Sequence, residues 1–353
     1  MDINPYLKQV AESHSPDLHL KVGRVPVVRL TDGQLYDMQN SEVLTRESME
    51  EVIKQILGDK KYVIYKEKQE VDGSYAADGV GRFRVNVFTE IDGPAIAMRS
   101  IPDIIPTLTG LGYPEVIREF TKKGRGLIVV TGPTSSGKST TLAAMVNEIN
   151  SSRRAHILTI EDPIEFIHKS NRSLISQREV GMHTDSFPAA IKSALREDPN
   201  VILIGEMRDL ETIAAAITLA ETGHLVLATL HTQDAAQTVD RMIDVFPPTQ
   251  QQQIRAQLST TLLGIVAQTL IPRVDGNGRT VAFEILVRND AITNCIKEGT
   301  THQIYSMMQI GKADGMITLD TSLATLLKEG VISQESARAK AHDPELVFNL
   351  AQQ

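Results

Sequence analysis

Gly132-Pro133-Thr134-Ser135-Ser136-Gly137-Lys138-Ser139 fits the pattern G-x-x-x-x-G-K-[ST], in which a glycine-rich loop holds phosphate groups. An apolar run at 127–130 precedes the loop and a helical pattern follows it from Lys138. Glycines let backbone N–H groups turn toward phosphate oxygens, and the N-terminal end of the following helix adds partial positive charge. The stretch therefore predicts a strand–loop–helix unit that binds the phosphates of a nucleotide.

The side chains of this loop have separate predicted roles toward ATP and Mg²⁺. Lys138 is expected to reach the β- and γ-phosphates, and the Ser139 hydroxyl to ligate Mg²⁺. Thr140 is placed to contact the α-phosphate. The predicted nucleotide-binding residues of the loop are Gly132, Pro133, Thr134, Ser135, Ser136, Gly137, Lys138, Ser139 and Thr140.

The chain around the loop alternates between short apolar strands and helices. The predicted strands are 127–130, 156–160, 201–204 and 225–229, and the predicted helices are 138–149, 187–196 and 209–223. Short apolar strands separated by helices favour a parallel sheet that is covered on both faces. The sequence therefore predicts the α/β class for this part of the chain.

Two carboxylates follow strands of this predicted sheet. Glu206 comes directly after the strand 201–204, and Glu161 ends the strand before it. Because ligands bind at the carboxyl ends of parallel strands, both side chains are candidate catalytic groups, and Glu206 is also a candidate for the Mg²⁺ shell. Gly205 stands where a usual Walker B strand has aspartate. A helix cap or a surface ion pair is the alternative for either carboxylate.

Two histidines flank the strand 225–229. His231 lies at its carboxyl end, where an imidazole can sense a γ-phosphate, and His224 lies at its start, further from the predicted chemistry. A structural role is the alternative for both. No cluster of His, Cys and Asp has the spacing of a zinc site, so no protein-bound zinc is expected.

Three arginines of the first hundred residues are further candidates for nucleotide binding. Arg82 and Arg84 share one face of a predicted strand, Arg82 to Phe88, because strand side chains alternate. Arg99 is on the next predicted strand, 95–101. Guanidinium groups can clamp the phosphates of a neighbouring active site. The alternative is a solvated strand face with ion pairs.

The sequence divides into a small N-terminal domain, a linker and a larger domain. Residues 1–101 are expected to form an α+β domain that includes a helix from Ser48 to Gly58, with Ser48 and Glu51 as its capping box. Residues 102–114 contain five Pro and Gly residues and are the predicted linker. The predicted larger domain is 115–353, of which 289–353 form a helical tail.

A further helix is expected after the two prolines at 247–248. Its predicted apolar face is made by residues at helical spacing, namely Ile254, Leu258, Leu262, Ile265 and Ile271. Val281 to Val287 is the predicted edge strand, and Thr318 to Glu329 a helix that Gly330 ends.

Composition excludes several classes of protein. The net charge is −8, there is no Trp, and aromatic residues are 4% of the chain, so a strongly basic or base-stacking nucleic-acid binder is not expected. Cys295 is the only cysteine, which excludes an internal disulfide or a four-cysteine zinc motif. The start of the chain lacks the pattern of a signal peptide, and no apolar run is long enough to cross a membrane. A cytoplasmic protein that reaches a membrane only by docking is expected.

The order of motifs resembles the secretion-type hexameric ATPases and, among them, the type IV pilus retraction ATPases. The similar segments cover nearly the whole chain and are 15–20, 81–84, 132–141, 159–166, 177–180, 195–199, 205–212, 222–225 and 230–232. In that family Glu161 belongs to the Asp box, Glu206 to an atypical Walker B motif, and His224 and His231 to the His box.

The resemblance implies a PAS-like N-terminal domain joined to a RecA-like ATPase domain, with six copies in a ring. It further implies ATP between the two domains, closed on by arginines of the N-terminal domain. The implied partners are other copies of the chain, a pilus platform protein at the inner membrane where the ring docks, and a paralogous retraction ATPase. Nucleic acid and direct membrane insertion are not implied.

Two features separate this chain from its relatives. Assembly and type II secretion ATPases usually have an additional N-terminal domain and a four-cysteine motif; with 353 residues and one cysteine this chain is expected to have neither, so retraction is favoured. The retraction motif Ala-Ile-Arg-x-Leu-Ile reads Ala-Ile-Thr-Asn-Cys-Ile at 291–296, with Thr293 and Cys295 in place of Arg and Leu. An accessory or regulatory ATPase of the same superfamily is therefore an alternative, and a RecA-like nucleic-acid translocase is another.

Overall fold

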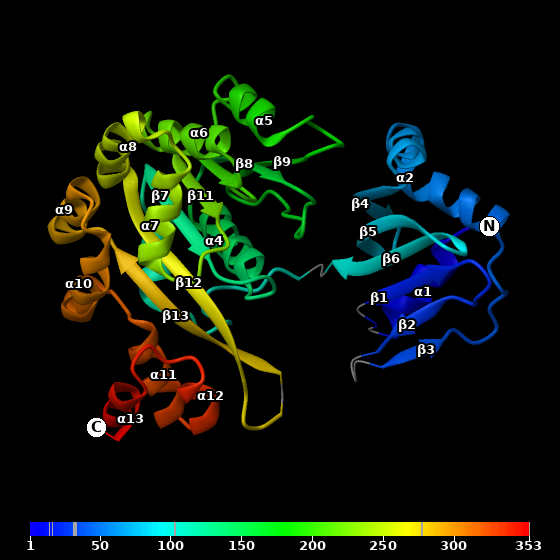
Figure 1. The fold of residues 1–353 in the computed structure, drawn as a ribbon. Helices are drawn as coiled ribbons and strands as arrows, with labels where there is room; N and C mark the ends of the chain where they lie inside the picture. The colour runs from blue at the N-terminus through cyan, green and yellow to red at the C-terminus, as the bar shows by residue number, and fades with distance from the viewer. Residues whose placement is uncertain (14, 16, 31–33, 102–103, 277, 353) are drawn as a thin grey trace. The chain divides into compact units, whose positions relative to one another are not determined.

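The computed structural model describes residues 1–352 except 14, 16, 31–33, 102–103 and 277. The described chain forms two compact units (Figure 1). Unit 1 comprises Met1–Ile105, Asp162–Ile167 and Glu179–Asp185, and unit 2 comprises Pro106–Glu161, His168–Arg178 and the residues from Ser186 on. The division between 105 and 106 falls inside the predicted linker. Two short segments that were predicted within the larger domain belong to unit 1.

Unit 1 is built around a six-stranded antiparallel sheet in the order β3-β2-β1-β6-β5-β4. Its elements are α1 (Asn4–Glu12), β1 (Asp17–Lys21), β2 (Val27–Arg29), β3 (Leu35–Asp37), α2 (Arg46–Lys68), β4 (Glu70–Ala77), β5 (Gly81–Glu90) and β6 (Gly93–Ile101). Its core joins α1 and α2 to the sheet through side chains such as Leu7, Ile53 and Phe83. The prediction of an α+β unit here is confirmed, although β2, β3 and β4 were not predicted.

The helix α2 differs from its prediction at both ends. Thr45, not Ser48, is the N-cap: its hydroxyl accepts from the Ser48 N–H at 3.2 Å, and the Ser48 hydroxyl accepts from the Thr45 N–H at 3.0 Å. The helix then runs to Lys68, past Gly58, whose φ of 63° and ψ of 176° are not helical. Gly58 therefore marks a kink and not an end, since the helical pattern resumes after one glycine.

Unit 2 is built around a seven-stranded sheet in the order β13-β12-β7-β11-β10-β8-β9. Its elements up to this sheet's last strand are α3 (Glu115–Thr121), β7 (Gly126–Thr131), α4 (Lys138–Ser152), β8 (His156–Glu161), β9 (Leu174–Glu179), α5 (Phe187–Ala194), β10 (Val201–Ile204), α6 (Leu210–Glu221), β11 (Leu225–Thr229), α7 (Ala235–Asp244), α8 (Pro248–Thr261), β12 (Leu262–Pro272) and β13 (Arg279–Val287). The strands β8, β10, β11, β7 and β12 are parallel, and β13 is antiparallel to β12 at the edge. The α/β prediction is confirmed.

The centre of this sheet is buried on both faces. Every residue of β7, β10 and β11 is buried, which is the pattern of a parallel sheet with helices on both sides. Ile128 and Val130 of β7 pack in one core with residues of α3 and α4, such as Phe120 and Met145. The helix α6 packs on β7 and β11. The loop after β7 is thereby held between a rigid strand and a rigid helix.

The long helix predicted after residue 247 is wrong beyond Thr261. The helix α8 ends there, and Leu262–Pro272 is the strand β12, paired with both β7 and β13. A strand buried on both faces carries apolar residues at nearly every position, so its pattern also matches helical spacing. Leu262, Ile265 and Ile271 are therefore strand residues.

The glycine Gly264 lies where β12 packs closely on α3. A Cβ atom at this position would lie 2.2 Å from Cζ of Phe120 and 2.7 Å from the Leu286 carbonyl oxygen. Gly264→Ala is therefore expected to destabilise the fold by roughly 1–3 kcal/mol, the usual effect of overpacking a core. The check is the midpoint of chemical unfolding. Gly124→Ala is the control, since nothing lies within 4 Å of a Cβ there. Equal midpoints for the two variants would contradict this packing.

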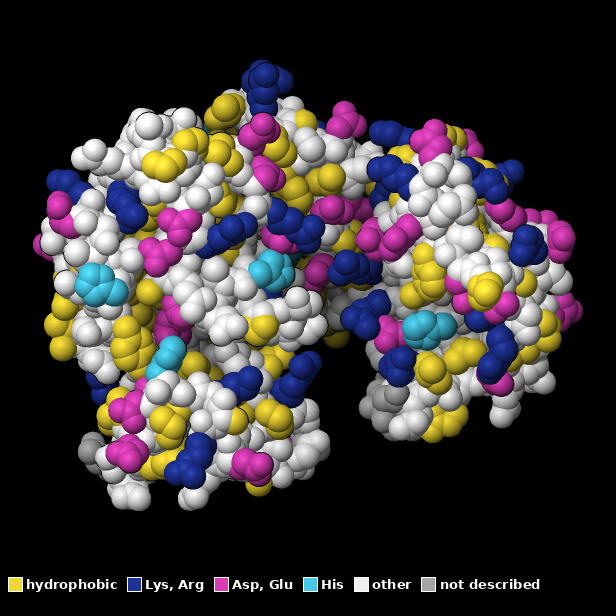
Figure 2. Space-filling model, in the orientation of Figure 1, with side chains coloured by type: hydrophobic (Ala, Val, Ile, Leu, Met, Phe, Trp, Pro, Cys, Tyr) yellow, Lys and Arg dark blue, Asp and Glu magenta, His cyan; other side chains and the backbone are white. Residues whose placement is uncertain are grey.

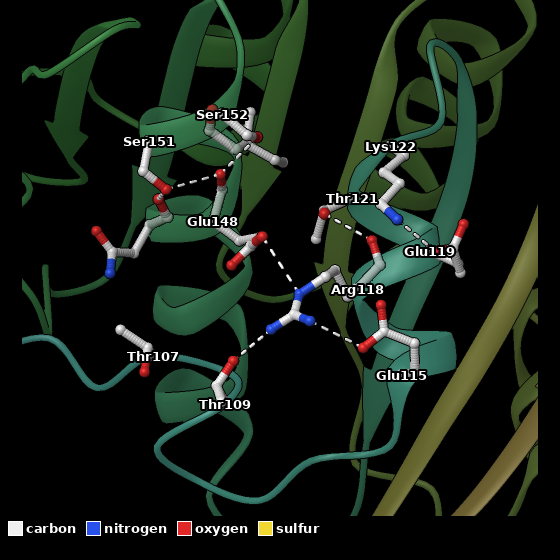
Figure 3. A network of polar contacts seen from close by, with 12 residues as sticks. Thr107, Thr109, Glu115, Arg118, Glu119, Thr121, Lys122, Glu148, Ser151 and Ser152 are labelled. Atoms are coloured by element: carbon white, nitrogen blue, oxygen red, sulfur yellow. Dashed lines mark hydrogen bonds and ion pairs between the residues drawn. The ribbon is translucent and has the colours of Figure 1, made fainter.

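The segment 106–114 of the predicted linker belongs to unit 2. Leu108 is buried in the unit 2 core. Figure 3 shows Arg118 of α3 in contact with Thr109, Glu115 and Glu148. The Arg118–Glu115 contact is 2.9 Å and the Arg118–Glu148 contact, which reaches α4, is 3.3 Å. Polar contacts as well as apolar packing therefore attach this segment and α3 to α4.

The end of the chain forms small helices (Figure 1). They are α9 (Asp290–Glu298), α10 (Ile304–Ile310), α11 (Leu319–Lys328), α12 (Gln334–Arg338) and α13 (Pro344–Gln352), with 3₁₀ turns at Thr301–Gln303 and Gly311–Asp314. The last three of these helices pack on the β12–β13 hairpin. Ile271 and Ala282 of the hairpin share a core with Leu323 and Val347 of these helices. The helix predicted at 318–329 is α11; Thr318 is its N-cap, and Gly330 follows its end as predicted.

Candidate active site

The phosphate loop adopts a backbone that requires glycine at its start. Gly132 has φ 139°, and a Cβ atom there would lie 2.3 Å from the Gln268 carbonyl oxygen of β12. Gly137 has φ 93° and is the N-cap of α4. The loop therefore passes close to β12 and ends at the N-terminus of a 15-residue helix, which adds partial positive charge there.

Lys138 and Ser136 are the two buried polar side chains of this loop. Lys138 Nζ donates to the carbonyl oxygens of Gly132 at 2.9 Å and Pro133 at 3.0 Å, so the ammonium lies over the loop. Ser136 Oγ is buried, and within the described part of the chain it has no hydrogen-bond partner. Inward-facing cationic and hydroxyl donors fit the oxygens of a bound phosphate. Ser139 and Thr140 are partly exposed on the first turn of α4, as a contact with nucleotide requires.

Glu206 is brought to this loop together with His231. His231 Nε2 lies 3.1 Å from Glu206 Oε1, and His231 Nδ1 lies 3.4 Å from Lys138 Nζ. Arg208 Nε lies 2.5 Å from the same Glu206 oxygen. Burial raises the pKa of Glu206, but the hydrogen bond from Arg208 and the charges of Arg208 and His231 outweigh it and leave this pKa below its usual value. Glu206 is therefore ionised at neutral pH, as a metal ligand or base must be.

Glu161 lies at the end of the neighbouring strand β8. Its Oε1 accepts from the Thr159 hydroxyl at 2.7 Å and from Gln177 Nε2 at 3.4 Å. A Cβ atom at Gly205 would lie 3.2 Å from Glu161 Cα, which is tighter than most real contacts. The glycine in the usual Walker B aspartate position therefore accommodates the close approach of Glu161.

Sequence reasoning missed the polar groups that hold the strand ends together. Arg208 and Gln177 contact the two carboxylates, and Thr131 Oγ1 at the end of β7 donates to the Thr232 carbonyl at 2.7 Å. Threonines at strand ends are common, so only a prediction of which strands neighbour one another could have singled out Thr131 and Thr232.

His224 is not brought to the phosphate loop within unit 2. It lies at the start of β11, and its Nδ1 is 3.0 Å from the Leu219 carbonyl at the end of α6. The strand β11 separates it from His231, which follows the other end. The interpretation of His224 as a nucleotide-binding residue stays a prediction.

The three candidate arginines lie on the sheet of unit 1. Arg84 and Arg99 are direct partners in the β5–β6 register, and Phe83 between Arg82 and Arg84 is buried on the opposite face. Arg82 Nη2 donates to Ser74 Oγ at 2.6 Å and lies 3.4 Å from Glu179, which is fully buried. Arg99 Nε donates to Asp17 at 2.7 Å, and Arg84 lies 3.9 Å from Glu165. The ion pairs expected as the alternative are therefore present, and the role in nucleotide binding stays a prediction.

Comparison with known proteins identifies the family of this chain. The family model described as type II/IV secretion system protein matches residues 1–341. The chain belongs to this family. It is 49% identical over 306 residues to a twitching motility protein of Neisseria gonorrhoeae, covering 87% of this chain and 82% of that protein. It is 47% identical to the type IV pilus retraction ATPase PilT of Pseudomonas aeruginosa, covering 98% of this chain and 99% of that protein.

A solved structure of the pilus retraction motor PilT with bound ADP is similar along the whole chain. It superposes with a TM-score of 0.90 at 43% identity and covers 98% of each chain. This member of the type II/IV secretion system family is therefore an ATPase with a nucleotide-binding P-loop. In the described ranges no group of three or more His, Cys, Asp and Glu side chains is arranged to hold a metal ion, and no helix there is long and apolar enough to cross a bilayer.

Proposed function

We propose that this chain hydrolyses Mg²⁺-bound ATP to drive the retraction of type IV pili. The observation that carries the proposal is its full-length similarity to PilT, combined with a phosphate loop that presents Lys138 and Ser136 inward. Hydrolysis transfers the γ-phosphoryl group to water, so the protein must position the water and neutralise the developing charge.

In this proposal each polar side chain around the phosphate loop has its own role in hydrolysis. Ser139 and Glu206 would hold a bound Mg²⁺ ion, and Lys138 would neutralise charge on the β- and γ-phosphates. Glu206, which is ionised and lies beside His231, orients the attacking water. Glu161, fixed by Thr159 and Gln177, supports the same water or the metal shell. Mg²⁺ supplies charge neutralisation when bound.

We further propose that six copies of the chain form a ring that docks on a pilus platform protein at the inner membrane. The arginines of unit 1 then complete a nucleotide site, and hydrolysis moves the units relative to one another. Arg84 suits this role because its side chain is 47% exposed and its contact with Glu165 is long. A nucleic-acid track is disfavoured, since acidic and basic side chains are interspersed over the visible face of each unit in Figure 2.

Arg84→Ala is expected to lower ATP turnover by as much as about 10³-fold, the lower end of what an arginine finger supplies. Nucleotide affinity is expected to change far less, since the phosphate loop is intact. The measurement is steady-state phosphate release at saturating ATP. Arg24→Ala is the matched control, because the Arg24 side chain is 59% exposed and its ion pair with Asp37 lies in the same unit. Equal turnover in the two variants would remove Arg84 from the site.

An accessory motor role is the second candidate, and the motif at 291–296 favours it. Cys295 is only 4% exposed in α9, so its replacement of leucine alters packing and not the exposed surface. Thr293 is half-buried and stands where the retraction motif given above has Arg, so this position lacks that positive charge.

Deletion of the coding sequence tests the biological role. The proposal expects more surface pili and loss of twitching motility, both restored by the wild-type chain and not by Glu206→Gln. Unchanged pilus number and motility would refute a role as the main retraction motor. Motility that is lost only under load, or only in the absence of a paralogous ATPase, would indicate the accessory role instead.

A further inference from the structure

The strand β13 carries a buried carboxylate that the proposed chemistry does not use. Glu284 is 3% exposed and lies opposite Ala267 of β12 in the antiparallel register. Its Oε1 accepts a hydrogen bond from the Ala235 N–H at 2.8 Å, and its Oε2 has no hydrogen-bond partner among the described residues. Burying a carboxylate costs free energy unless its contacts compensate, so the contacts of Glu284 indicate its role.

Glu284 fixes the first residue of the helix α7. Ala235 is the first residue of this helix, and the segment that leads into it contains His231 and Thr232. The first N–H groups of a helix have no partner within the helix, so a carboxylate that accepts from one of them fixes the helix start. Asp234 caps the same end by accepting from the Gln237 N–H at 2.8 Å.

A continuous set of hydroxyl contacts connects this helix start to the phosphate loop. Thr238 Oγ1 of α7 lies 2.6 Å from Thr232 Oγ1, which lies 2.8 Å from Thr131 Oγ1. Thr131 is the residue directly before Gly132. His231, next to Thr232, reaches Glu206 and Lys138 at the distances given above. The position of α7 therefore determines where His231 and Thr232 lie against the loop.

The other side of Glu284 faces the C-terminal helices. His342 Nε2 lies 3.9 Å from Glu284 Oε2. The backbone N–H of His342 donates at 2.8 Å to Asp320 of α11, which is fully buried and also accepts from Tyr305 of α10 at 2.8 Å. Burial raises the pKa of Glu284, and the nearby charges of Asp234 and Asp320 act in the same direction, against the Ala235 N–H and His342.

We propose that Glu284 is a positioning residue for ATP hydrolysis: it fixes the start of α7, and thereby His231 and Thr232, against the phosphate loop. Through His342 it also connects this arrangement to the helices α10–α13. The inference rests on hydrolysis at the phosphate loop as proposed above.

Three variants of the full-length chain test the role of Glu284. Glu284→Met has nearly the same length but no acceptor, and it is expected to lower kcat at least about tenfold, the equivalent of one lost hydrogen bond to a charged group. Its KM for ATP is expected to stay within about threefold of the parent. Glu284→Gln keeps an oxygen for the Ala235 N–H and is expected to restore most of kcat. Glu345→Gln, an exposed carboxylate of α13, is the control.

Hydrogen–deuterium exchange separates positioning from general stability. Glu284→Met is expected to speed exchange in 230–238 and to leave α4 and β7 as protected as in the parent, whereas Glu284→Gln resembles the parent. If Glu284→Met does not fold, Glu284→Asp replaces it, since the shorter side chain loses reach while the charge stays.

The inference is overturned if Glu284→Met keeps the kcat of the parent, even if its KM or its unfolding midpoint changes. It is also overturned if Glu284→Gln has a kcat as low as that of Glu284→Met. In each of these cases the proposed function still holds if the parent chain hydrolyses ATP and the Glu206→Gln variant does not.

Discussion

Glu206→Gln is expected to lower ATP turnover by about 10²–10⁴-fold, the range that general acid–base groups contribute. The structure places Glu206 next to His231 and Arg208, in a position where its carboxylate is ionised. Glutamine has the same shape, but it cannot accept a proton from water and is a weaker ligand for Mg²⁺. Nucleotide binding is expected to persist, because the contacts of Lys138 and the loop backbone are unaffected.

The measurement pairs phosphate release with equilibrium binding of a fluorescent nucleotide. Glu211→Gln is the matched control, since Glu211 is an exposed carboxylate on the first turn of the neighbouring helix α6. A Glu206→Gln protein that hydrolyses ATP as fast as its parent would assign the essential carboxylate elsewhere, with Glu161 as the next candidate.

Gly132→Ala is expected to weaken nucleotide binding substantially. The φ of 139° is strained for any residue with a Cβ, and the Cβ would meet the Gln268 carbonyl at 2.3 Å. Backbone strain of this kind costs about 1–3 kcal/mol, which corresponds to about 5- to 150-fold in affinity when the loop must shift to relieve it. Both kcat/KM and nucleotide affinity are therefore expected to fall together.

Isothermal titration with ADP measures this effect directly. Gly124→Ala, in the turn before β7 and without neighbours around its Cβ, is the control for a glycine replacement in the same unit. The close approach of Gly132 to β12 is contradicted if Gly132→Ala binds ADP as tightly as Gly124→Ala does.

Much of unit 2 was predictable because its parallel strands are short, apolar and separated by clear helix caps. Asp209 illustrates this: the predicted helix begins at this residue, and in the structure its carboxylate caps α6 by accepting from the Thr212 N–H at 2.8 Å. The phosphate loop was predictable because its residue types follow directly from the geometry that binds phosphate.

Other features depend on contacts between distant parts of the chain. The sequence pattern of the strand β12 predicts a helix because a strand buried on both faces loses its alternation. Gln177 and Glu284 act through residues distant in the sequence, Glu161 and Ala235, whereas Arg208 contacts Glu206 two residues away. The segments Asp162–Ile167 and Glu179–Asp185 join unit 1 for the same reason, since Glu179 contacts Lys61 and Arg82 there.

Steady-state ATP hydrolysis by the purified full-length chain tests the central claim most directly. The assay compares Mg²⁺ with EDTA, and each with and without DNA. The account predicts Mg²⁺-dependent phosphate release that DNA leaves unchanged and that Glu206→Gln removes. Nucleotide binding without turnover would indicate a regulatory subunit, and turnover only with DNA a translocase; either result would contradict the account.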